Sequence, residues 1–514
     1  MVAPAFAQDN SEYVRARAAD AAGLSGLASA GYSAALAADP DDEILAMRAY
    51  RQALSAGDYA LASRAAAVLE RAGTAPPDTA LLAFATALKA RDAKAADAAL
   101  ARIGSGPLAF LNPVLQAWLA VERGQDPMPA LEKARGNTLA MRFAVRHRPL
   151  LLIASGRSAE AQAALSEMLA SGGEENDDLR IDAASLFAST GDRKRAEPLI
   201  AGGRSDYTQL RKRLGKSVKP GAAFGASRLF LGVAEDIAEQ QIAVLSILLT
   251  RSALLLDPDD DRARLYLAEA LSESGANTLA LAELAKVTPD SPYRRGAQAG
   301  LIAALQRTGR TADALPVARA LASDRDATAA DARTYGDVLA ASAQYAAAAD
   351  AYASALGRTG GDGGWELHYL QGSALDRAGK WQAALPALRR AVELGPDQAA
   401  ALEYLGYAQV VRGENLPEAQ ALLERASQLK PDDAGISASL AWAYYTQGDA
   451  ARAVPLLEKA VAGDPGGVRS NEQLGDAYWK LGRHYEARYA WSAAAIYAEA
   501  DAVQRIEGKI AKGL

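Results

Sequence analysis

A helical repeat is clearest in residues 438–465, which read ASLAWAYYTQGDAARAVPLLEKAVAGDP. Apolar residues recur there every three or four positions, a Gly-Asp pair interrupts them near the middle, and a proline closes the stretch. This order predicts two short helices, A and B, with a tight turn between them and a stop after the second. Pro396, Pro431 and Pro465 end three such stretches and lie 35 and 34 residues apart. The chain therefore repeats a helix-turn-helix unit of about 34 residues.

The repeats share further residues at fixed places, which are small where the two helices meet and large where one unit meets the next. In three consecutive units they are Leu405-Gly406 with Ala419, Leu423 and Ala426; Leu440-Ala441 with Tyr444, Ala453, Leu457 and Ala460; and Leu474-Gly475 with Tyr478, Ala487, Trp491 and Ala494. These residues and their period resemble the tetratricopeptide repeat (TPR), most clearly over residues 330–500. The resemblance implies an all-α fold, an α-solenoid of stacked TPR-like helix-turn-helix repeats that form a right-handed superhelix.

The pattern fades toward the N-terminus, and this fading sets the expected domain organisation. Residues 227–514 are expected to form the C-terminal TPR solenoid and residues 8–213 a set of degenerate N-terminal helical repeats, with about 11 to 14 helix pairs in the whole chain. Residues 214–226 read LGKSVKPGAAFGA, which favours a hinge or loop. Residues 1–7 are interpreted as the remainder of a signal peptide, because Ala5-Phe6-Ala7 fits the small-x-small pattern that precedes a cleavage site.

The composition excludes several classes of protein. Alanine makes up close to a quarter of the 514 residues, while cysteine is absent and histidine occurs three times. No disulfide framework can form, and three widely separated histidines do not make a zinc site. A net charge of −6 disfavours nucleic acid as a partner. No uninterrupted apolar run reaches the roughly 18 residues that a membrane-spanning helix needs, so no transmembrane segment is expected.

No motif of an enzyme or a cofactor site stands out, and the chain is expected to be non-enzymatic, with no cofactor and no metal. Gly215-Lys216-Ser217 resembles the end of a phosphate-binding loop, but the first glycine of that loop would fall on Leu210, and no strand precedes it. Acidic clusters such as residues 39–42 and 257–261 precede helices, whose N-termini favour carboxylates. We therefore predict a structural, capping role for these acids.

The predicted partner-binding residues follow from the TPR resemblance, in which positions 2, 5, 9 and 12 of helix A line the concave surface. At these positions the chain places aromatic side chains among carboxylates, and aromatic anchors dominate the energetics of many protein interfaces. The predicted residues are Tyr369, Glu403, Tyr407, Trp442, Tyr445, Glu472, Asp476 and Trp479. The alternative is that the two tryptophans only pack between helices. The Lys and Asn with which chaperone-binding TPRs hold a carboxylate are absent from these positions, so that function is not implied.

The last repeat, residues 471–491, is similar to the final repeat of a group of long proteobacterial envelope TPR proteins. Some of these are outer-membrane lipoproteins that deliver substrates to carboxyl-terminal processing proteases, although this chain lacks their lipid-attachment cysteine. We therefore expect a non-enzymatic scaffold or adaptor, periplasmic or otherwise exported, that binds a protein or peptide in its concave groove, with a processing protease as one candidate partner. Two alternatives stay open: a TPR component of a polysaccharide export or envelope assembly machine, and an enzyme with a TPR accessory region. Self-association is compatible with all three.

Overall fold

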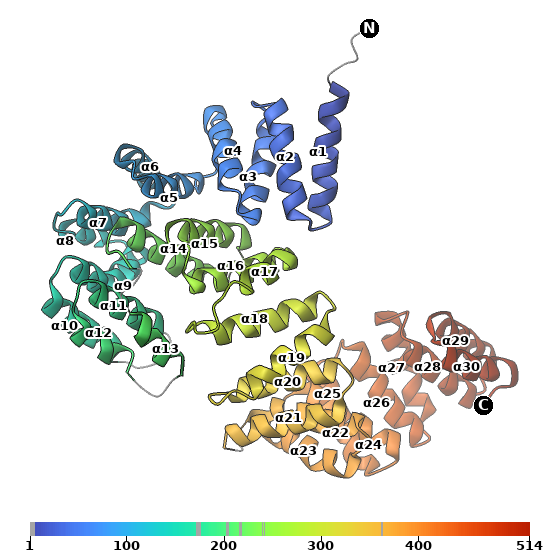
Figure 1. The fold of residues 1–514 in the computed structure, drawn as a ribbon. Coiled ribbons are helices and arrows are strands. Elements are labelled where there is room, and N and C mark those ends of the chain that lie inside the picture. The colour runs from blue at the N-terminus through green and yellow to red at the C-terminus, as the bar shows by residue number, and fades with distance from the viewer. Residues whose placement is uncertain are drawn as a thin grey trace, which may run out of the picture. The chain divides into compact units, whose positions relative to one another are not determined.

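The computed structural model of the chain is built from helices (Figure 1). It describes residues 6–170, 176–201, 205–214, 218–238, 240, 242–360 and 363–514. Thirty α-helices and two short 3-10 helices occur in these ranges, and no strand does. The all-α fold expected from the sequence is confirmed. None of the helices in the described ranges is long and apolar enough to cross a membrane.

The chain divides into two compact units, residues 1–318 (unit 1) and residues 319–514 (unit 2). Unit 1 contains α1 (Phe6–Ala21), α2 (Ser25–Ala38), α3 (Glu43–Ala56), α4 (Tyr59–Ala72), α5 (Thr79–Ala90), α6 (Ala93–Ser105), η1 (Ala109–Leu111), α7 (Asn112–Glu122), α8 (Met128–Leu131), η2 (Glu132–Ala134), α9 (Thr138–Ala154), α10 (Ser158–Leu169), α11 (Asp177–Ser189), α12 (Arg193–Leu199), α13 (Ser205–Arg213), α14 (Ala222–Ala238), α15 (Ala243–Leu256), α16 (Asp261–Glu273), α17 (Asn277–Leu284) and α18 (Arg294–Arg307). Helix α19 (Thr311–Ala322) contains the division between the units.

Unit 2 continues with α20 (Ala329–Ala341), α21 (Tyr345–Arg358), α22 (Gly364–Arg377), α23 (Trp381–Leu394), α24 (Ala399–Arg412), α25 (Leu416–Leu429), α26 (Ala434–Thr446), α27 (Ala450–Gly463), α28 (Val468–Lys480), α29 (His484–Tyr497) and α30 (Ala500–Lys512). Each even-numbered helix from α20 to α28 packs against the helix that follows it, so these are the A and B helices of five repeats. Helix α30 packs on α29 and has no B helix after it.

Short polar residues explain where many of the helices begin. The carboxylates of seven aspartates accept a hydrogen bond from a backbone N–H in the first turn of a helix, which satisfies one of the donors left open there. These residues are Asp42, Asp58, Asp92, Asp192, Asp260, Asp433 and Asp449. The capping role predicted for the acidic clusters is confirmed at Asp42 and Asp260.

The segment 214–226, expected to be a hinge or loop, is partly helical. Helix α14 begins at Ala222, whose backbone N–H donates to the Glu122 carboxylate at 3.0 Å. Gly225 then lies so close to the Trp118 indole that a Cβ there would overlap the ring. These contacts fix the start of α14 against α7, and the division of the chain into two compact units falls at residues 318 and 319.

Two of the sequence-based predictions fall partly outside the described residues. One is the interpretation of residues 1–7 as the remainder of a signal peptide, since residues 1–5 lie outside the described ranges. The other concerns residues 215–217, which resemble the end of a phosphate-binding loop and also lie outside the described ranges.

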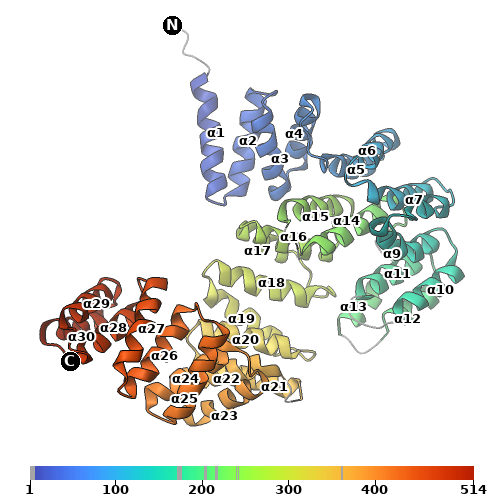
Figure 2. The same ribbon diagram turned by 180° about the vertical axis from the view of Figure 1, so that it is seen from behind.

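Unit 1 is not a simple linear stack of repeats, because its own later helices pack against its first ones. Helix α15 contacts α3 and α5, and helix α14 contacts α5, α7 and α9. Figure 2 shows this pair, in green, lying beside the blue and teal helices. The contacted helices α3, α5 and α9 are the first helices of their pairs, the ones that line the concave side of a TPR array. That side of the N-terminal repeats is therefore largely occupied by the chain itself.

A single arginine ties α15 to the turn between α3 and α4. The Arg251 guanidinium donates to the Leu54 carbonyl at 2.9 Å and to the Ser55 carbonyl at 2.6 Å, and it pairs with the Glu283 carboxylate at 2.8 Å. The Tyr59 hydroxyl donates back to the Arg251 carbonyl at 2.8 Å. Since Arg251 is buried, these bonds replace the water that its charge would otherwise need.

A second buried charge cluster joins α11, α14 and α16. Arg228 pairs with Asp182 at 2.8 Å and with Asp260 at 2.7 Å, and Arg262 pairs with Asp178 at 2.9 Å and with Asp182 at 3.2 Å. Burial by itself raises the pKa of Asp260, but the two arginines and two backbone N–H donors outweigh it and lower that pKa overall. The cluster keeps the Asp260 carboxylate ionised and fixes the register of three helices that are distant in sequence.

Candidate functional site

Close approach of the A and B helices shapes the site in unit 2. A Cβ on Gly406 would lie 2.8 Å from the Leu423 side chain, and a Cβ on Gly475 would overlap the Trp491 indole. Ala441, at the same position in the repeat between them, is fully buried. Small residues are therefore required at these places, as the sequence predicts, because any larger side chain would push helix A away from helix B. This spacing sets the surface that the A helices present.

Three of the predicted partner-binding residues connect different A helices of unit 2. Tyr369 of α22 packs edge-on against Tyr404 of α24, with ring centroids 5.7 Å apart. The Ser439 hydroxyl of α26 donates to the Glu403 carboxylate at 2.6 Å. Tyr407 carries a guanidinium on its ring face, that of Arg469, at 4.7 Å. Tyr369, Glu403 and Tyr407 are half-buried, so each still offers part of its surface to a partner.

Electrostatics at Glu403 are shaped by burial more than by any ion pair. Burial raises the pKa of this carboxyl group, and the hydrogen bond from Ser439 and the nearby Arg469 charge offset only part of the effect. No ion pair of Glu403 occurs among the described residues, so its charge is compensated mainly by a hydroxyl. A cationic or hydrogen-bond-donating group of a partner would complete its environment.

Trp442 and Tyr445 form a stacked pair on α26. Their ring centroids are 4.7 Å apart and their planes lie 15° from parallel. Both are half-buried, and both also contact core side chains of neighbouring repeats. The Trp442 ring thus packs against other side chains, as the packing interpretation expects, and it also keeps an open portion that a partner could contact.

The last three predicted residues lie under the C-terminal helix α30. Lys509 donates to the Asp476 carboxylate at 2.7 Å and to that of Glu472 at 2.7 Å, and Arg505 pairs with Glu472 as well. A Cβ on Gly513 would overlap the Trp479 indole. This helix therefore occupies the place where a partner of α28 would bind.

Further contacts hold the α28 residues inside the repeat. The Trp491 indole N–H donates to the Asp476 carboxylate at 2.9 Å. Trp479 packs against His484, with ring centroids 4.0 Å apart, and against Trp491, at 5.5 Å. Trp479 thus packs between helices, which is the alternative interpretation of the two tryptophans. The structure thus separates the predicted set into an open group on α22, α24 and α26 and a covered group on α28.

The cover formed by α30 could have been found from the sequence. Arg505 follows Glu472 by 33 residues, and Lys509 follows Asp476 by the same interval, which is about one repeat. Cations at that spacing, with Ile506 buried between them, mark an additional A helix stacked on α28. Arg469 is the other residue of the site that sequence analysis missed, because its contact with Tyr407 spans two repeats.

Comparisons with known proteins agree with the repeat pattern. A tetratricopeptide repeat family model matches residues 369–434, 410–468 and 438–503. No curated protein matches the chain.

Several solved structures resemble the chain at low sequence identity. A tetratricopeptide repeat protein from Parabacteroides merdae is 14% identical over 49% of this chain and 99% of that one, with a TM-score of 0.42. The APC/C hetero-tetramer Cut9–Hcn1 is 14% identical over 91% of this chain and 96% of that one, with a TM-score of 0.40. MamA from Desulfovibrio magneticus is 20% identical over 33% of this chain and 94% of that one, with a TM-score of 0.30.

The family matches fall on α22 to α29, the helices that carry the open and the covered groups of predicted residues. The A–B pairing, the small residues at the helix contacts and the matched repeats lead to one conclusion. Residues 369–503 therefore contain tetratricopeptide repeats, within an all-α solenoid fold.

Proposed function

We propose that this protein is a non-catalytic interaction scaffold that binds a protein or peptide on the A-helix face of α22, α24 and α26. TPR repeats support a protein-interaction role in general, since each repeat stacks only on its neighbours and together they present an extended binding surface. One observation carries the more specific choice of site. Tyr369, Tyr407, Trp442 and Tyr445 keep open portions there, whereas Glu472 and Asp476 of α28 are buried and paired with α30, and the half-buried Trp479 lies against Gly513 at its end.

The chemistry of this face indicates what a partner must offer. Aromatic rings favour apolar and planar groups, and they bury large areas at low entropic cost. Glu403 offers a carboxylate that is compensated mainly by the Ser439 hydroxyl and partly by the nearby Arg469 charge. Its charge in turn raises the pKa of Tyr369, after the larger effect of burial. A peptide that pairs apolar anchors with one basic side chain would satisfy both features.

A site-specific photo-crosslinker tests the proposed face in the native cell. A crosslinking amino acid in place of Tyr445 should capture a discrete partner, and the same amino acid in place of Tyr345 on the B helix α21 should not. Substituting Trp442→Ala should reduce the capture at least tenfold, because the stacked ring is lost. Equal capture from both positions, or capture that survives Trp442→Ala unchanged, would place the interface elsewhere.

The matched stability control uses the same variants. Trp442→Ala and Tyr345→Ala should both keep the helical circular dichroism of the parent chain. A loss of helicity in Trp442→Ala alone would mean that the tryptophan is a packing residue and that the reduced capture reports misfolding.

We further propose that the scaffold works outside the cytoplasm, with delivery of substrates to a carboxyl-terminal processing protease as its sharpest form. The support is the Ala5-Phe6-Ala7 pattern and the similarity of residues 471–491 to envelope TPR proteins. Cell fractionation tests the location: recovery of the native protein in the cytoplasmic fraction would contradict it. Co-purification from envelope extracts tests the partner, and recovery of export-machine components in place of a protease would favour the polysaccharide-export alternative.

A further inference from the structure

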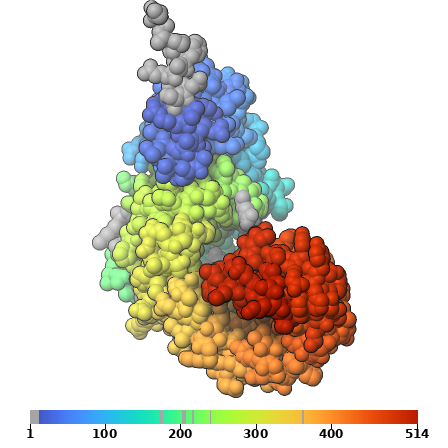
Figure 3. Space-filling model, turned by 90° about the vertical axis from the view of Figure 1, so that its right-hand side faces the viewer, coloured from blue at the N-terminus to red at the C-terminus, as the bar shows by residue number. Residues whose placement is uncertain are grey.

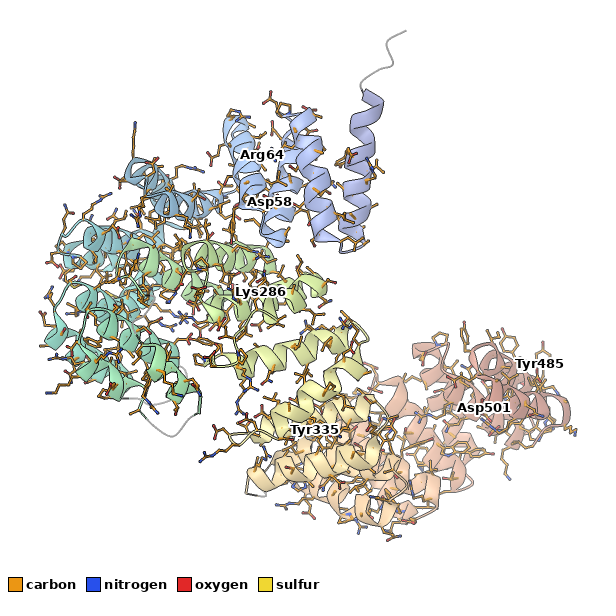
Figure 4. All side chains as sticks on the ribbon, viewed as in Figure 1. Asp58, Arg64, Lys286, Tyr335, Tyr485 and Asp501 are labelled. Carbon is orange, nitrogen blue, oxygen red and sulfur yellow. The ribbon has the colours of Figure 1, made fainter. Side chains whose placement is uncertain are left out.

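An exposed apolar stripe runs along α29, the B helix of the last repeat. Tyr485, Tyr489 and Ile496 are 83%, 75% and 74% exposed, and Ser492 is the exposed residue between them. Their spacing of four and seven residues places them on one face of the helix. Figure 4 labels Tyr485 at the outside of unit 2. We call Tyr485, Tyr489, Ser492 and Ile496 the α29 stripe.

The other repeats of unit 2 supply an internal control for this stripe. The alanine that begins the B-helix signature, Ala487 in α29, fixes the alignment of the B helices. The positions that match Tyr485, Tyr489 and Ile496 are Gln382, Pro386 and Glu393 in α23, Pro417, Ala421 and Gln428 in α25, and Ala451, Pro455 and Ala462 in α27. All nine residues are exposed, although another repeat follows each of these helices. The stripe is thus not a surface left open because the array ends there.

Large apolar side chains at these places are a property of the last repeat alone among the five of unit 2. In α21 the matching residues are Ala346, Asp350 and Gly357, so the other four repeats hold only proline, alanine, glycine, glutamine, glutamate or aspartate there, which suit a solvated surface. Exposing three large side chains in one row costs solubility unless something covers them. Figure 3 shows the C-terminal part of unit 2 in red. The high exposure of Tyr485, Tyr489 and Ile496 means that α30 does not cover the stripe.

We propose that the α29 stripe binds the α29 stripe of a second copy of this chain, in an antiparallel, two-fold arrangement. In a two-fold contact only the residues nearest the axis lie close to their own copies, so a charged residue at the centre would face a like charge. The stripe has no charged residue. An antiparallel pairing centred between Tyr489 and Ser492 sets Tyr485 against Ile496, and Tyr489 against the small Ser492, of the second copy.

The charges that border the stripe are already engaged within one chain. Arg488 donates to the Ile510 carbonyl at 2.9 Å, and Arg483 pairs with Glu486 at 3.1 Å. These bordering charges therefore need no opposite charge from a partner. A binding site for a charged protein would instead offer charges that are not yet paired. The uncharged stripe with satisfied borders matches a copy of itself better than it matches a charged ligand.

The size of the stripe sets the expected strength of the contact. It extends over about 16 Å of helix, and its exposed side chains amount to about 500 Å² on each copy, given the area of a tyrosine or isoleucine side chain. A standard interface buries about 800 Å² on each partner. The contact is thus smaller than that of a permanent dimer, and a reversible dimer with a dissociation constant on the order of 10–100 μM is expected.

Sedimentation velocity of the full chain tests the proposal over a concentration range of about 1–300 μM. The weight-average mass should rise from that of the 53.6 kDa monomer toward twice that value. The variant Tyr485→Gln, Tyr489→Ala, Ile496→Gln takes its residues from matching positions of other repeats and should dimerise at least tenfold more weakly. The control Ala451→Gln, Ala462→Gln on α27 should dimerise like the parent chain. A parent chain that stays monomeric at every concentration, or a stripe variant that dimerises undiminished, overturns the proposal.

Disulfide trapping tests the antiparallel geometry, because the chain has no cysteine of its own. The variant Ser492→Cys places one thiol near the proposed two-fold axis, where two copies can meet the Cα separation of about 4.4–6.8 Å that a disulfide requires. It should form a covalent dimer under mild oxidation, and Ala462→Cys on α27 should not. Equal trapping of both variants would show random collision and would contradict the proposed arrangement.

Discussion

Arg251 shows what one residue can contribute to a repeat protein when it joins distant repeats. Its guanidinium holds two carbonyl groups at the end of α3 and the Glu283 carboxylate at the end of α17. Burial by itself raises the pKa of Glu283, but Arg251 and Lys286 outweigh burial and lower that pKa overall. Stability from this pair is therefore present above the ordinary carboxyl pKa and is lost as the pH falls through the lowered value.

Arg251→Ala should destabilise unit 1 strongly, by about 3–5 kcal/mol, because it leaves Glu283 buried without its main cation and removes the guanidinium donors of the Leu54 and Ser55 carbonyls. Urea unfolding of the full chain, followed by circular dichroism, measures the change in the first transition.

Lys286→Ala is the matched control for this prediction. Lys286 also contacts Glu283, at 3.1 Å, but its side chain is largely exposed, so about 0–1 kcal/mol is expected. Equal effects of the two substitutions would show that Arg251 is one surface charge among several and does not join α15 to α3.

At the scale of single residues, some contacts can be predicted from the sequence and others cannot. Gly475 and Gly406 could be assigned to helix contacts from the repeat pattern alone, since every repeat has the same need. Arg251 lies in an apolar run, and the two carbonyl groups that it holds are nearly 200 residues away in sequence. No local pattern predicts such a contact, because it depends on how the repeats fold back.

At the scale of elements, α30 is the helix that changes the site most. It covers the A-helix face of α28, with Ile506 buried and two cations over Glu472 and Asp476. A helix that stacks on a repeat in this way shields the apolar side of that repeat from water. The predicted residues of α28 therefore stabilise the array while α30 stays in place.

A chain that ends at Glu499 should lose roughly 2–4 kcal/mol of the stability of unit 2, since the buried Ile506 and the cover of Trp479 are removed. Tryptophan emission should shift to longer wavelength at the same time, because Trp479 becomes exposed to water. The emission shift should be absent when the same truncation is made in a Trp479→Phe background.

A chain that ends at Gly513 serves as the control, because the exposed Leu514 is all it lacks. Its stability and emission should equal those of the full chain. If the longer truncation also leaves both unchanged, α30 does not cover α28 in solution, and the α28 residues would join the open group of binding residues.

At the scale of the whole molecule, the two compact units differ in how they are built. Unit 2 is a sequence of regular repeats in which each helix contacts its near neighbours. Unit 1 contains long-range contacts, because α14 and α15 pack against helices of the first repeats. Regular repeats gain stability from each neighbour in turn, whereas a folded-back array gains it from the complete unit.

Residues 311–514, which contain all of α19 and unit 2, should fold when expressed alone. Helical circular dichroism and a cooperative thermal transition that matches one transition of the full chain are expected, since the core of unit 2 lies within this fragment. The fragment 1–170 lacks α14 and α15 and should be much less stable than the same region in the full chain. An unfolded 311–514 fragment would show that unit 2 depends on unit 1.

The sequence by itself determined the all-α class, the repeat length and the small residues between helices A and B, because these are set by contacts within one unit of about 34 residues that recurs along the chain. It also indicated the aromatic residues of the A helices, whose positions follow from the same period. The tertiary structure alone decided that α14 and α15 occupy the face of the first repeats, that the units divide near residue 318 and that α30 covers α28. These features depend on contacts between repeats far apart in the chain, and a local pattern of residues does not encode which distant surface it will meet.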